Sequence, residues 1–235
     1  MGVESSYYSG LVYNSTGMIC FYVALAITAL ASIILRVINK KYSGIENDKG
    51  VTGFEVAKRI LSDNGLDNIK IGQIGGTLTD YYNNGTKEIR LSNSVYDEKT
   101  IAAIAVAAHE CGHALQYKDG YGPIKLRNGI AKIASIGNTI GYIALAIGFF
   151  ASITGLVYIG VALMFFAIIF QLITLPVEFN ASKRARKELI RLGLISESEA
   201  GGVRKMLNAA GFTYIAGLLS SLLEIIRLLS YVRKK

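Results

Sequence analysis

The 235-residue sequence contains only two cysteines and only two histidines. Cys20 lies in an apolar run and Cys111 lies in a separate, more polar segment. The chain therefore has no disulfide framework, and a reducing compartment is expected around its polar part. With two histidines, a metal site built on three histidines is excluded. The sequence also has no internal repeat and no low-complexity tract.

Charged residues are missing from two long stretches, residues 18–35 and 133–177. About 20 apolar residues cross a bilayer, so the first stretch suffices for one crossing and the second for two. A further apolar run, residues 209–232, is interrupted only by Glu224 and Arg227, which we expect to pair with each other. With 51% hydrophobic residues, the chain is predicted to be a membrane protein with about four transmembrane or membrane-associated helices.

Acidic residues are fewer than basic ones, and the net charge is +8. This excess does not predict nucleic-acid binding, because the basic residues cluster beside the apolar runs, where such charge orients membrane segments and attracts anionic lipid. The clusters are Lys40 and Lys41, residues 125–132, residues 183–187 and residues 233–235. Membrane lipid is therefore an expected partner, and nucleic acid is not.

The N-terminus lacks a basic segment, which argues against a cleaved signal peptide. Positive charge follows the first apolar run instead, so the positive-inside rule places the N-terminus outside the cell. The predicted segments are an external tail (1–17), a transmembrane helix (18–38), a cytoplasmic portion (39–132), a transmembrane helical hairpin (133–177), a cytoplasmic helical segment (178–208) and a fourth apolar helix with a basic C-terminus (209–235). If the last helix crosses the membrane, its basic C-terminus lies outside, against the positive-inside rule. The helix therefore either spans the membrane despite the rule or lies along the membrane surface.

Residues 39–132 predict a small α+β unit with a short β-hairpin. A helix is expected from Thr52, whose side chain caps it together with Glu55 three residues later. The other expected elements are two short strands, 78–82 and 88–91, joined by Asn83-Asn84-Gly85, and an alanine-rich helix from Ser94 or Asp97 to about Tyr117.

Both histidines of the chain fall in the run His109-Glu110-Cys111-Gly112-His113. Histidines four residues apart share one face of a helix, so both imidazoles reach one metal ion. Zinc lowers the pKa of a bound water to about 7, and Glu110 is placed to accept a proton from that water. Two histidines without a ligand would be costly in so apolar a helix. We therefore interpret the motif as a zinc site with Glu110 as general base.

A catalytic zinc of this kind needs a third protein ligand. Cys20 lies in a membrane span and Cys111 faces away from the histidines, so a carboxylate is expected. Glu178 is a candidate because two membrane crossings separate it from His113 and return the chain to the same side. The residues alone leave other carboxylates open as well. These are Glu188, Glu197, Glu199 and Asp119.

The runs AAHECGHALQ (107–116) and TLPVEFNASKRA (174–185) resemble the YugP-type neutral zinc metallopeptidases of bacterial membranes. Shorter runs resemble the same family, including GTLTDYY at Gly76 and IRLSNSVY at Ile89. The resemblance covers roughly residues 20–235. It implies a gluzincin-like site in which His109, His113 and Glu178 hold one zinc ion and Glu110 is the base.

The sequence departs from the family pattern near Glu178. Members usually carry an acid two positions after the ligand glutamate, where this chain has Asn180, and related gluzincins have an aspartate four positions after it, where this chain has Ser182. An acid there would orient a ligating histidine, and an amide or a hydroxyl accepts the same hydrogen bond more weakly. Weaker zinc binding is therefore expected.

The hypothesis for function is a membrane-embedded zinc endopeptidase that acts on a protein or peptide substrate. Its active site is expected to face the cytoplasm at the cytoplasmic membrane of a bacterium. Candidates to stabilise the oxyanion are Tyr214, Tyr82 and Arg184. The alternatives are a non-catalytic adaptor or scaffold stabilised by zinc, and a transporter or scaffold in which the motif arose by chance. Substrate, cleavage preference, oligomeric state, regulation and partner proteins do not follow from the sequence.

Overall fold

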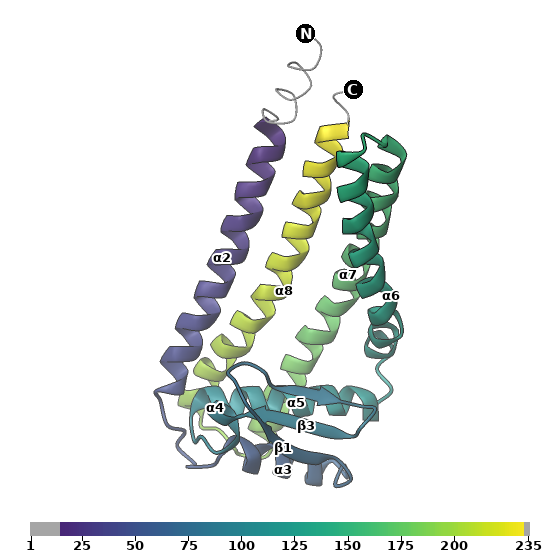
Figure 1. The fold of residues 1–235 in the computed structure, drawn as a ribbon. Helices are drawn as coiled ribbons and strands as arrows, with labels where there is room; N and C mark the ends of the chain where they lie inside the picture. Colours follow the sequence, from purple (N-terminus) through teal and green to yellow (C-terminus); the bar gives the residue numbers. More distant parts are fainter. Residues whose placement is uncertain (1–14, 233–235) are drawn as a thin grey trace, which may run out of the picture. The chain divides into compact units, whose positions relative to one another are not determined.

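The computed structural model describes residues 15–232 and is mainly helical (Figure 1). The chain divides into two compact units, one containing residues 126–174 with the two chain ends, and the other containing residues 32–125 and 175–212. Four long helices contribute to both units: α2 (Ser15–Ser43), α7 (Thr154–Arg191), α8 (Glu197–Val232) and, through its first turn, the helix that begins at Gly122. Most of the predicted external tail, residues 1–14, and the basic residues 233–235 lie outside the described residues.

The first unit consists of apolar helices. Within the described residues, α2, α6 (Gly122–Phe150), α7 and α8 are each long and apolar enough to cross a membrane, which confirms the predicted four-helix membrane protein. Residues 151–153 connect α6 to α7. These helices approach closely at two glycines, because a Cβ atom built on Gly160 would lie 2.8 Å from the Gly141 carbonyl oxygen. Small residues of this kind let membrane helices pack backbone against backbone.

The second unit contains a three-stranded sheet with the strand order β1-β3-β2. The predicted hairpin is confirmed: β2 (Tyr81–Asn83) pairs antiparallel with β3 (Glu88–Ser92). The sequence analysis missed β1 (Lys70–Ile74), which pairs parallel with β3. The predicted first helix is also confirmed as α3 (Gly53–Asp63), with Thr52 and Glu55 forming the expected capping box.

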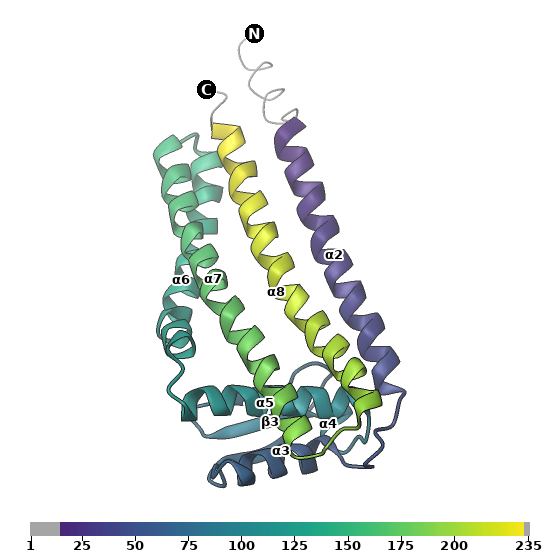
Figure 2. The same cartoon turned by 180° about the vertical axis from the view of Figure 1, so that it is seen from behind.

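The core of this unit surrounds α5 (Ile101–Lys118), most of whose side chains are buried among α3, the short helix α4 (Asn93–Tyr96) and the sheet. Figure 2 shows the C-terminal end of α7 lying against α5. Along that end Val177, Ala181, Ala185 and Leu189 are all fully buried. This spacing of four residues makes one apolar stripe, which packs the end of α7 into the core.

Two helices differ from the sequence-based expectation. The helix expected from Ser94 or Asp97 is interrupted at residues 97–100, because the carbonyls of Glu98 and Lys99 accept hydrogen bonds from the backbone of Gly53 and Asn47. The helical segment expected over residues 178–208 does not begin a new helix at Glu178, since α7 continues through Pro176 to Arg191. Packing of the buried stripe outweighs the one helical hydrogen bond that a proline removes.

Candidate metal centre

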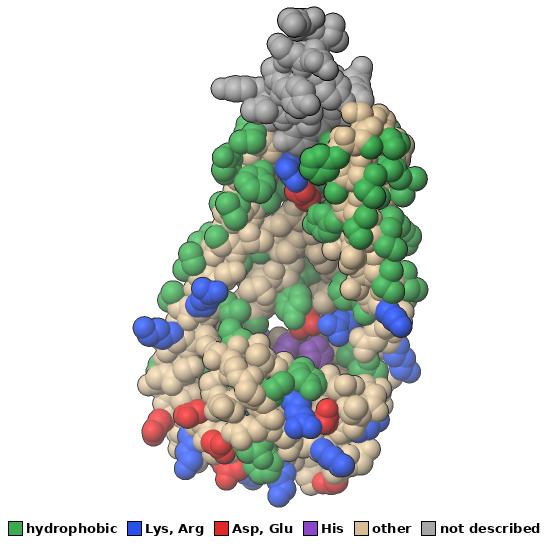
Figure 3. Space-filling model, in the orientation of Figure 1, with side chains coloured by type: hydrophobic (Ala, Val, Ile, Leu, Met, Phe, Trp, Pro, Cys, Tyr) green, Lys and Arg blue, Asp and Glu red, His purple; other side chains and the backbone are tan. Residues whose placement is uncertain are grey.

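The two histidines lie on one face of α5. Thr100 caps this helix by accepting a hydrogen bond from the Ala103 N–H, which sets where the helical turns begin. The ring centroids of His109 and His113 are 4.8 Å apart, and the rings stand nearly perpendicular to each other. Their side chains are 16% and 12% exposed. Figure 3 shows part of the histidine side chains in view on this face, so the protein does not cover them completely.

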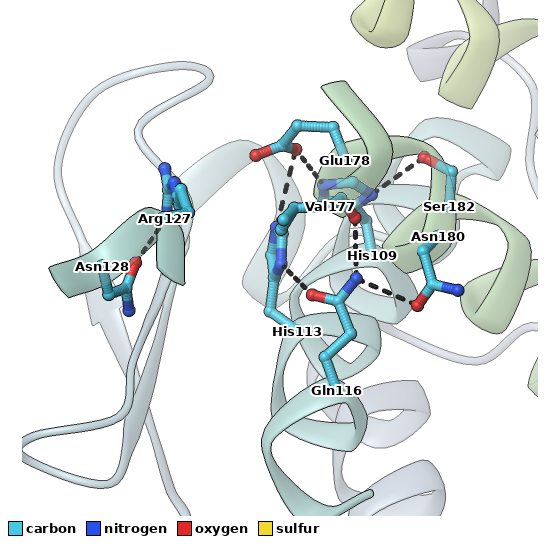
Figure 4. Close-up of polar contacts among 9 residues, drawn as sticks. All are labelled: His109, His113, Gln116, Arg127, Asn128, Val177, Glu178, Asn180 and Ser182. Carbon is cyan, nitrogen blue, oxygen red and sulfur yellow. Dashed lines mark hydrogen bonds and ion pairs between the residues drawn. The ribbon is translucent and has the colours of Figure 1, made fainter. Parts of the chain in front are cut away.

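Glu178 on α7 meets both imidazoles (Figure 4). One of its carboxylate oxygens lies 3.2 Å from Nε2 of His109 and 3.6 Å from Nε2 of His113. The Glu178 side chain is only 3% exposed. A buried carboxylate that faces two imidazole nitrogens favours a positive charge between them.

Close contact between α5 and α7 makes this meeting possible. A Cβ atom built on Gly112 would lie 2.4 Å from the backbone oxygen of Ala181, so only glycine fits at this position. Gly112 precedes His113 directly, and Ala181 lies three residues after Glu178. The absent side chain therefore lets the two backbones approach to the distance at which a glutamate side chain reaches both histidines.

The donor set fits zinc. Two ligands at 2.0–2.1 Å from a tetrahedral ion lie about 3.3 Å from each other. The separations of the Glu178 oxygen from the two nitrogens bracket that value, and all three ligand atoms lie within 4.8 Å of one another. Two imidazoles and one carboxylate form a common set for a catalytic zinc, which keeps a fourth position open for water or substrate.

The outer nitrogen of His113 is held by Gln116, a residue that the sequence analysis did not single out. The Gln116 amide nitrogen donates to the Val177 carbonyl at 2.7 Å and to Oδ1 of Asn180 at 3.1 Å. Its oxygen must therefore face Nδ1 of His113, 3.0 Å away. Nδ1 carries the proton, so Nε2 presents a lone pair toward Glu178, as a metal ligand requires. The only sequence signal was a glutamine three residues after His113, about one helical turn along.

The two residues that replace family acids have different partners. The hydroxyl of Ser182 lies 3.2 Å from Nδ1 of His109, so it contacts a histidine as expected. Asn180 does not contact a histidine directly. Its side-chain oxygen accepts hydrogen bonds from Gln116 and from Nε of Arg184, the latter at 2.7 Å. Asn180 therefore acts on His113 through Gln116.

Glu110 is buried beside the histidines. Burial is the largest influence on the pKa of its carboxyl and raises it, while His109 and His113 oppose the rise. Within residues 15–232 no side chain donates a hydrogen bond to this carboxyl, which leaves it available to a water molecule. Burial alone would lower the pKa of His113, yet the carboxylates of Glu178 and Glu110 raise it above its usual value. The surroundings of His113 thus favour a positive charge at its imidazole.

Two of the three oxyanion candidates have identified hydrogen-bond partners of their own. Arg184 donates to Asn180 and forms an ion pair with Asp119. Tyr82 donates its hydroxyl to Oδ1 of Asn84 at 3.0 Å, and burial raises its pKa to about 12. Tyr214 belongs to the other compact unit. Arg184 and Tyr82 are thus held by groups other than the histidines and Glu178, and the oxyanion role of all three residues stays a prediction.

Three of the four other carboxylates considered as ligands have their own partners. Glu188 accepts hydrogen bonds from Asn64 and Arg191. Glu199 accepts from the backbone of Asp48 and of Ser196. Asp119 pairs with Arg184, and Glu197 lies in the first turn of α8. Among the described residues, the metal-ligand cluster formed by histidines and a carboxylate contains Glu178 and none of these four.

Two comparisons with known proteins found matches. Residues 17–233 match the family model described as "Putative neutral zinc metallopeptidase". The chain belongs to this family. A protein of Bacillus subtilis (strain 168) named "Putative membrane protease YugP" is 41% identical over 204 residues, which make up 87% of this chain and 91% of that protein. No solved structure was found to match the chain.

Membership of the zinc metallopeptidase family confirms the resemblance seen in the sequence. At the level of the family it indicates zinc as the metal and peptides as the substrate class. The name of the Bacillus relative and the four apolar helices both indicate a membrane protein. The family does not assign roles to individual residues, so these roles are argued from the geometry and chemistry of the site.

Proposed function

We propose that the chain is an integral-membrane zinc endopeptidase whose single zinc ion is held by His109, His113 and Glu178. The observation that carries this proposal is the approach of the Glu178 carboxylate to both Nε2 atoms, 3.2 and 3.6 Å away. Gln116 supports it by holding His113 in the tautomer that a metal ligand needs. The family supplies the class of reaction, which is hydrolysis of peptide bonds.

Glu110 is the general base in this proposal. Zinc, when bound, would polarise the peptide carbonyl and make a water molecule more acidic. The Glu110 carboxylate accepts a proton from the attacking water and then delivers it to the leaving amine nitrogen. Burial suits both steps, because a raised pKa brings the carboxyl closer to neutral pH. His113 keeps its proton on the outer nitrogen, which Gln116 holds, and neither histidine takes part in proton transfer.

The proposed placement in the membrane follows the positive-inside rule. Residues 39–132 and 178–208, which include the site, face the cytoplasm of a bacterium, and the N-terminus lies outside. Residues 18–38, the hairpin 133–177 and the fourth apolar helix in 209–235 are the membrane segments. Membrane lipid and a protein or peptide substrate are the partners of this arrangement.

The decisive experiment compares Glu110→Gln with the wild type. Purified protein is loaded with zinc, its metal content is measured, and cleavage of fluorescent casein is followed. We expect zinc to stay bound while the rate falls about 10²–10⁴-fold, because only the base is removed. Glu98→Gln, a change of an exposed glutamate, is the control and should keep full activity. Undiminished cleavage by Glu110→Gln would disprove the assignment of the base.

A second candidate is a non-catalytic adaptor or scaffold in which zinc only stabilises the fold. It is favoured by the replacement of family acids by Asn180 and Ser182, which leaves His109 with a hydroxyl partner. In this case the wild-type protein would bind one zinc per chain and cleave neither casein nor peptides. Removal of zinc by a chelator would then lower the melting temperature without loss of any activity.

A further inference from the structure

A cavity of about 270 Å³ lies where the β2–β3 hairpin meets the C-terminal half of α5. The hairpin contributes Tyr82, Asn84 and Lys87 to its lining, and α5 contributes Ala114, Tyr117 and Lys118. All of these residues belong to the same compact unit as the candidate metal centre. The mechanism proposed above assigns no role to this cavity.

The charge of the lining is positive. It contains two lysines and no acidic residue. The Lys87 ammonium donates to Oδ1 of Asn84 at 2.6 Å, and the same oxygen accepts from the Tyr82 hydroxyl. Among residues 15–232, neither Lys87 nor Lys118 forms an ion pair with a carboxylate. An anionic group that enters the cavity would meet two ammonium groups with no acid competing for them.

Two aromatic rings give the cavity its shape. The ring centroids of Tyr82 and Tyr117 are 5.9 Å apart, and the rings are tilted against each other. Such faces pack well against the methylene groups of a side chain, while the lysines bind its charged end. The lining therefore suits an aspartate or glutamate side chain, which has both parts.

The strand β2 connects this cavity to the candidate active site. Ala114 directly follows His113 on α5, and Asp80, just before β2, interacts electrostatically with Glu110. In the middle of this short strand, Tyr82 contacts Tyr117. The strand order leaves β2 at an edge of the sheet, where an extended peptide can add as a further strand. Side chains of such a peptide would reach the cavity a few residues from the bond that is cut.

We propose that this cavity is a substrate subsite that selects peptides with an acidic residue near the cleaved bond. The inference rests on the proposed function, because it assigns a specificity to the same protease site. Lys87 and Lys118 bind the substrate carboxylate, and Tyr82 with Tyr117 forms the walls.

The test uses full-length, zinc-loaded protein in nanodiscs of neutral phosphatidylcholine. Fluorogenic peptides of one sequence carry Glu, Gln or Lys at each position in turn. We expect kcat/KM to be about tenfold higher for Glu than for Gln at one position, as two partly screened ion pairs would give. High salt should reduce this ratio.

In the double variant Lys87→Glu/Lys118→Glu the preference should reverse toward Lys. Lys58→Glu, an exposed lysine that lines a different cavity of the same unit, is the matched control.

A second measurement does not depend on turnover. Binding of the labelled Glu and Gln peptides to the Glu110→Gln protein is followed by fluorescence anisotropy, with and without the two lysine changes. A Glu preference that disappears with the lysines supports the subsite. An equal response to Glu and Gln peptides, or a preference that survives the lysine changes, overturns it.

The outcomes separate this inference from the proposed function. Cleavage by the wild type without any acidic preference overturns the subsite and leaves the protease intact. No cleavage of any peptide, with the Glu preference still present in binding, contradicts the protease and keeps an acidic-peptide site. If the Glu preference vanishes when anionic phosphatidylglycerol replaces the neutral lipid, the lysines bind headgroups and the subsite proposal is wrong.

Discussion

At the scale of single residues, the candidate centre depends on which nitrogen of each histidine carries the proton. For His113 the answer comes from Gln116, whose amide is oriented by two acceptors, the Val177 carbonyl and Asn180. For His109 the partner is a serine hydroxyl, which either donates or accepts a hydrogen bond. The two histidines are thus held with unequal strength, and His113 is the better oriented of the two.

Gln116→Leu should weaken zinc binding about 10–100-fold, because His113 loses the partner that holds its tautomer. Zinc affinity is measured by competition with a chelator that changes fluorescence. Gln73→Leu, which removes an exposed glutamine on β1, should leave the affinity unchanged. An unaltered affinity in Gln116→Leu would show that the hydrogen bond to His113 does not support the metal.

At the scale of elements, the centre requires that α5 and α7 almost touch. Gly112 and Ala181 are the residues of closest approach, and the buried stripe of α7 holds the contact. Two packed helices carry the ligands, so the geometry does not depend on a loop. A change that separates these helices should affect folding and metal binding together.

Gly112→Ala should lower the free energy of unfolding by about 1–3 kcal/mol, because the new methyl group overlaps the Ala181 backbone. It should also reduce zinc affinity, since Glu178 moves away from the imidazoles. Gly201→Ala on α8 is the control: its Cβ meets open space, and the change should stabilise the helix by up to about 1 kcal/mol. Chemical unfolding of both variants checks the prediction, which fails if the two behave alike.

At the scale of the whole molecule, the chain must be stable in contact with both membrane lipid and water. The first unit, which consists of the apolar helices, contains one ion pair among its described residues: Arg227 donates to Glu224 one turn away on α8. The pairing expected from the sequence is therefore confirmed. Arg227 also lies 5.7 Å from the ring of Phe21 on α2. A charge in a membrane segment is tolerated when such partners surround it.

Glu224→Leu should destabilise the protein by about 2–3 kcal/mol, because Arg227 then stays in the membrane without its carboxylate partner. The double variant Glu224→Leu/Arg227→Leu should recover most of the loss, since it removes both charges. Thermal unfolding in one detergent measures both effects. Equal stability of the single variant and the wild type would mean that the pair contributes little.

The proposed orientation is tested by labelling single introduced cysteines in intact cells with a membrane-impermeant maleimide. Ala151→Cys, in the exposed connection between α6 and α7, should react from outside. Asp67→Cys, exposed in the other unit, should react only after the cells are opened. Background labelling should be low because both native cysteines are buried. The reverse pattern would place the candidate active site outside the cell.

Local patterns determined much of this protein. The long apolar runs predicted the four apolar helices, the capping box predicted α3, and the spacing of His109 and His113 placed both on one helical face. These features depend on neighbours within a few residues, so periodicity alone reveals them. The same local reasoning failed at Pro176, where packing of a buried stripe outweighs the preference of a proline to end a helix.

Only the tertiary structure decided which distant groups meet. It chose Glu178 over four other carboxylates as the neighbour of the histidines, paired β1 with β3, and gave Gln116 its place between His113 and Asn180. Each of these contacts joins segments that are far apart in the sequence or turns on the rotamer of a buried side chain. Their free energy comes from the packing of the whole unit, which no short stretch of sequence contains.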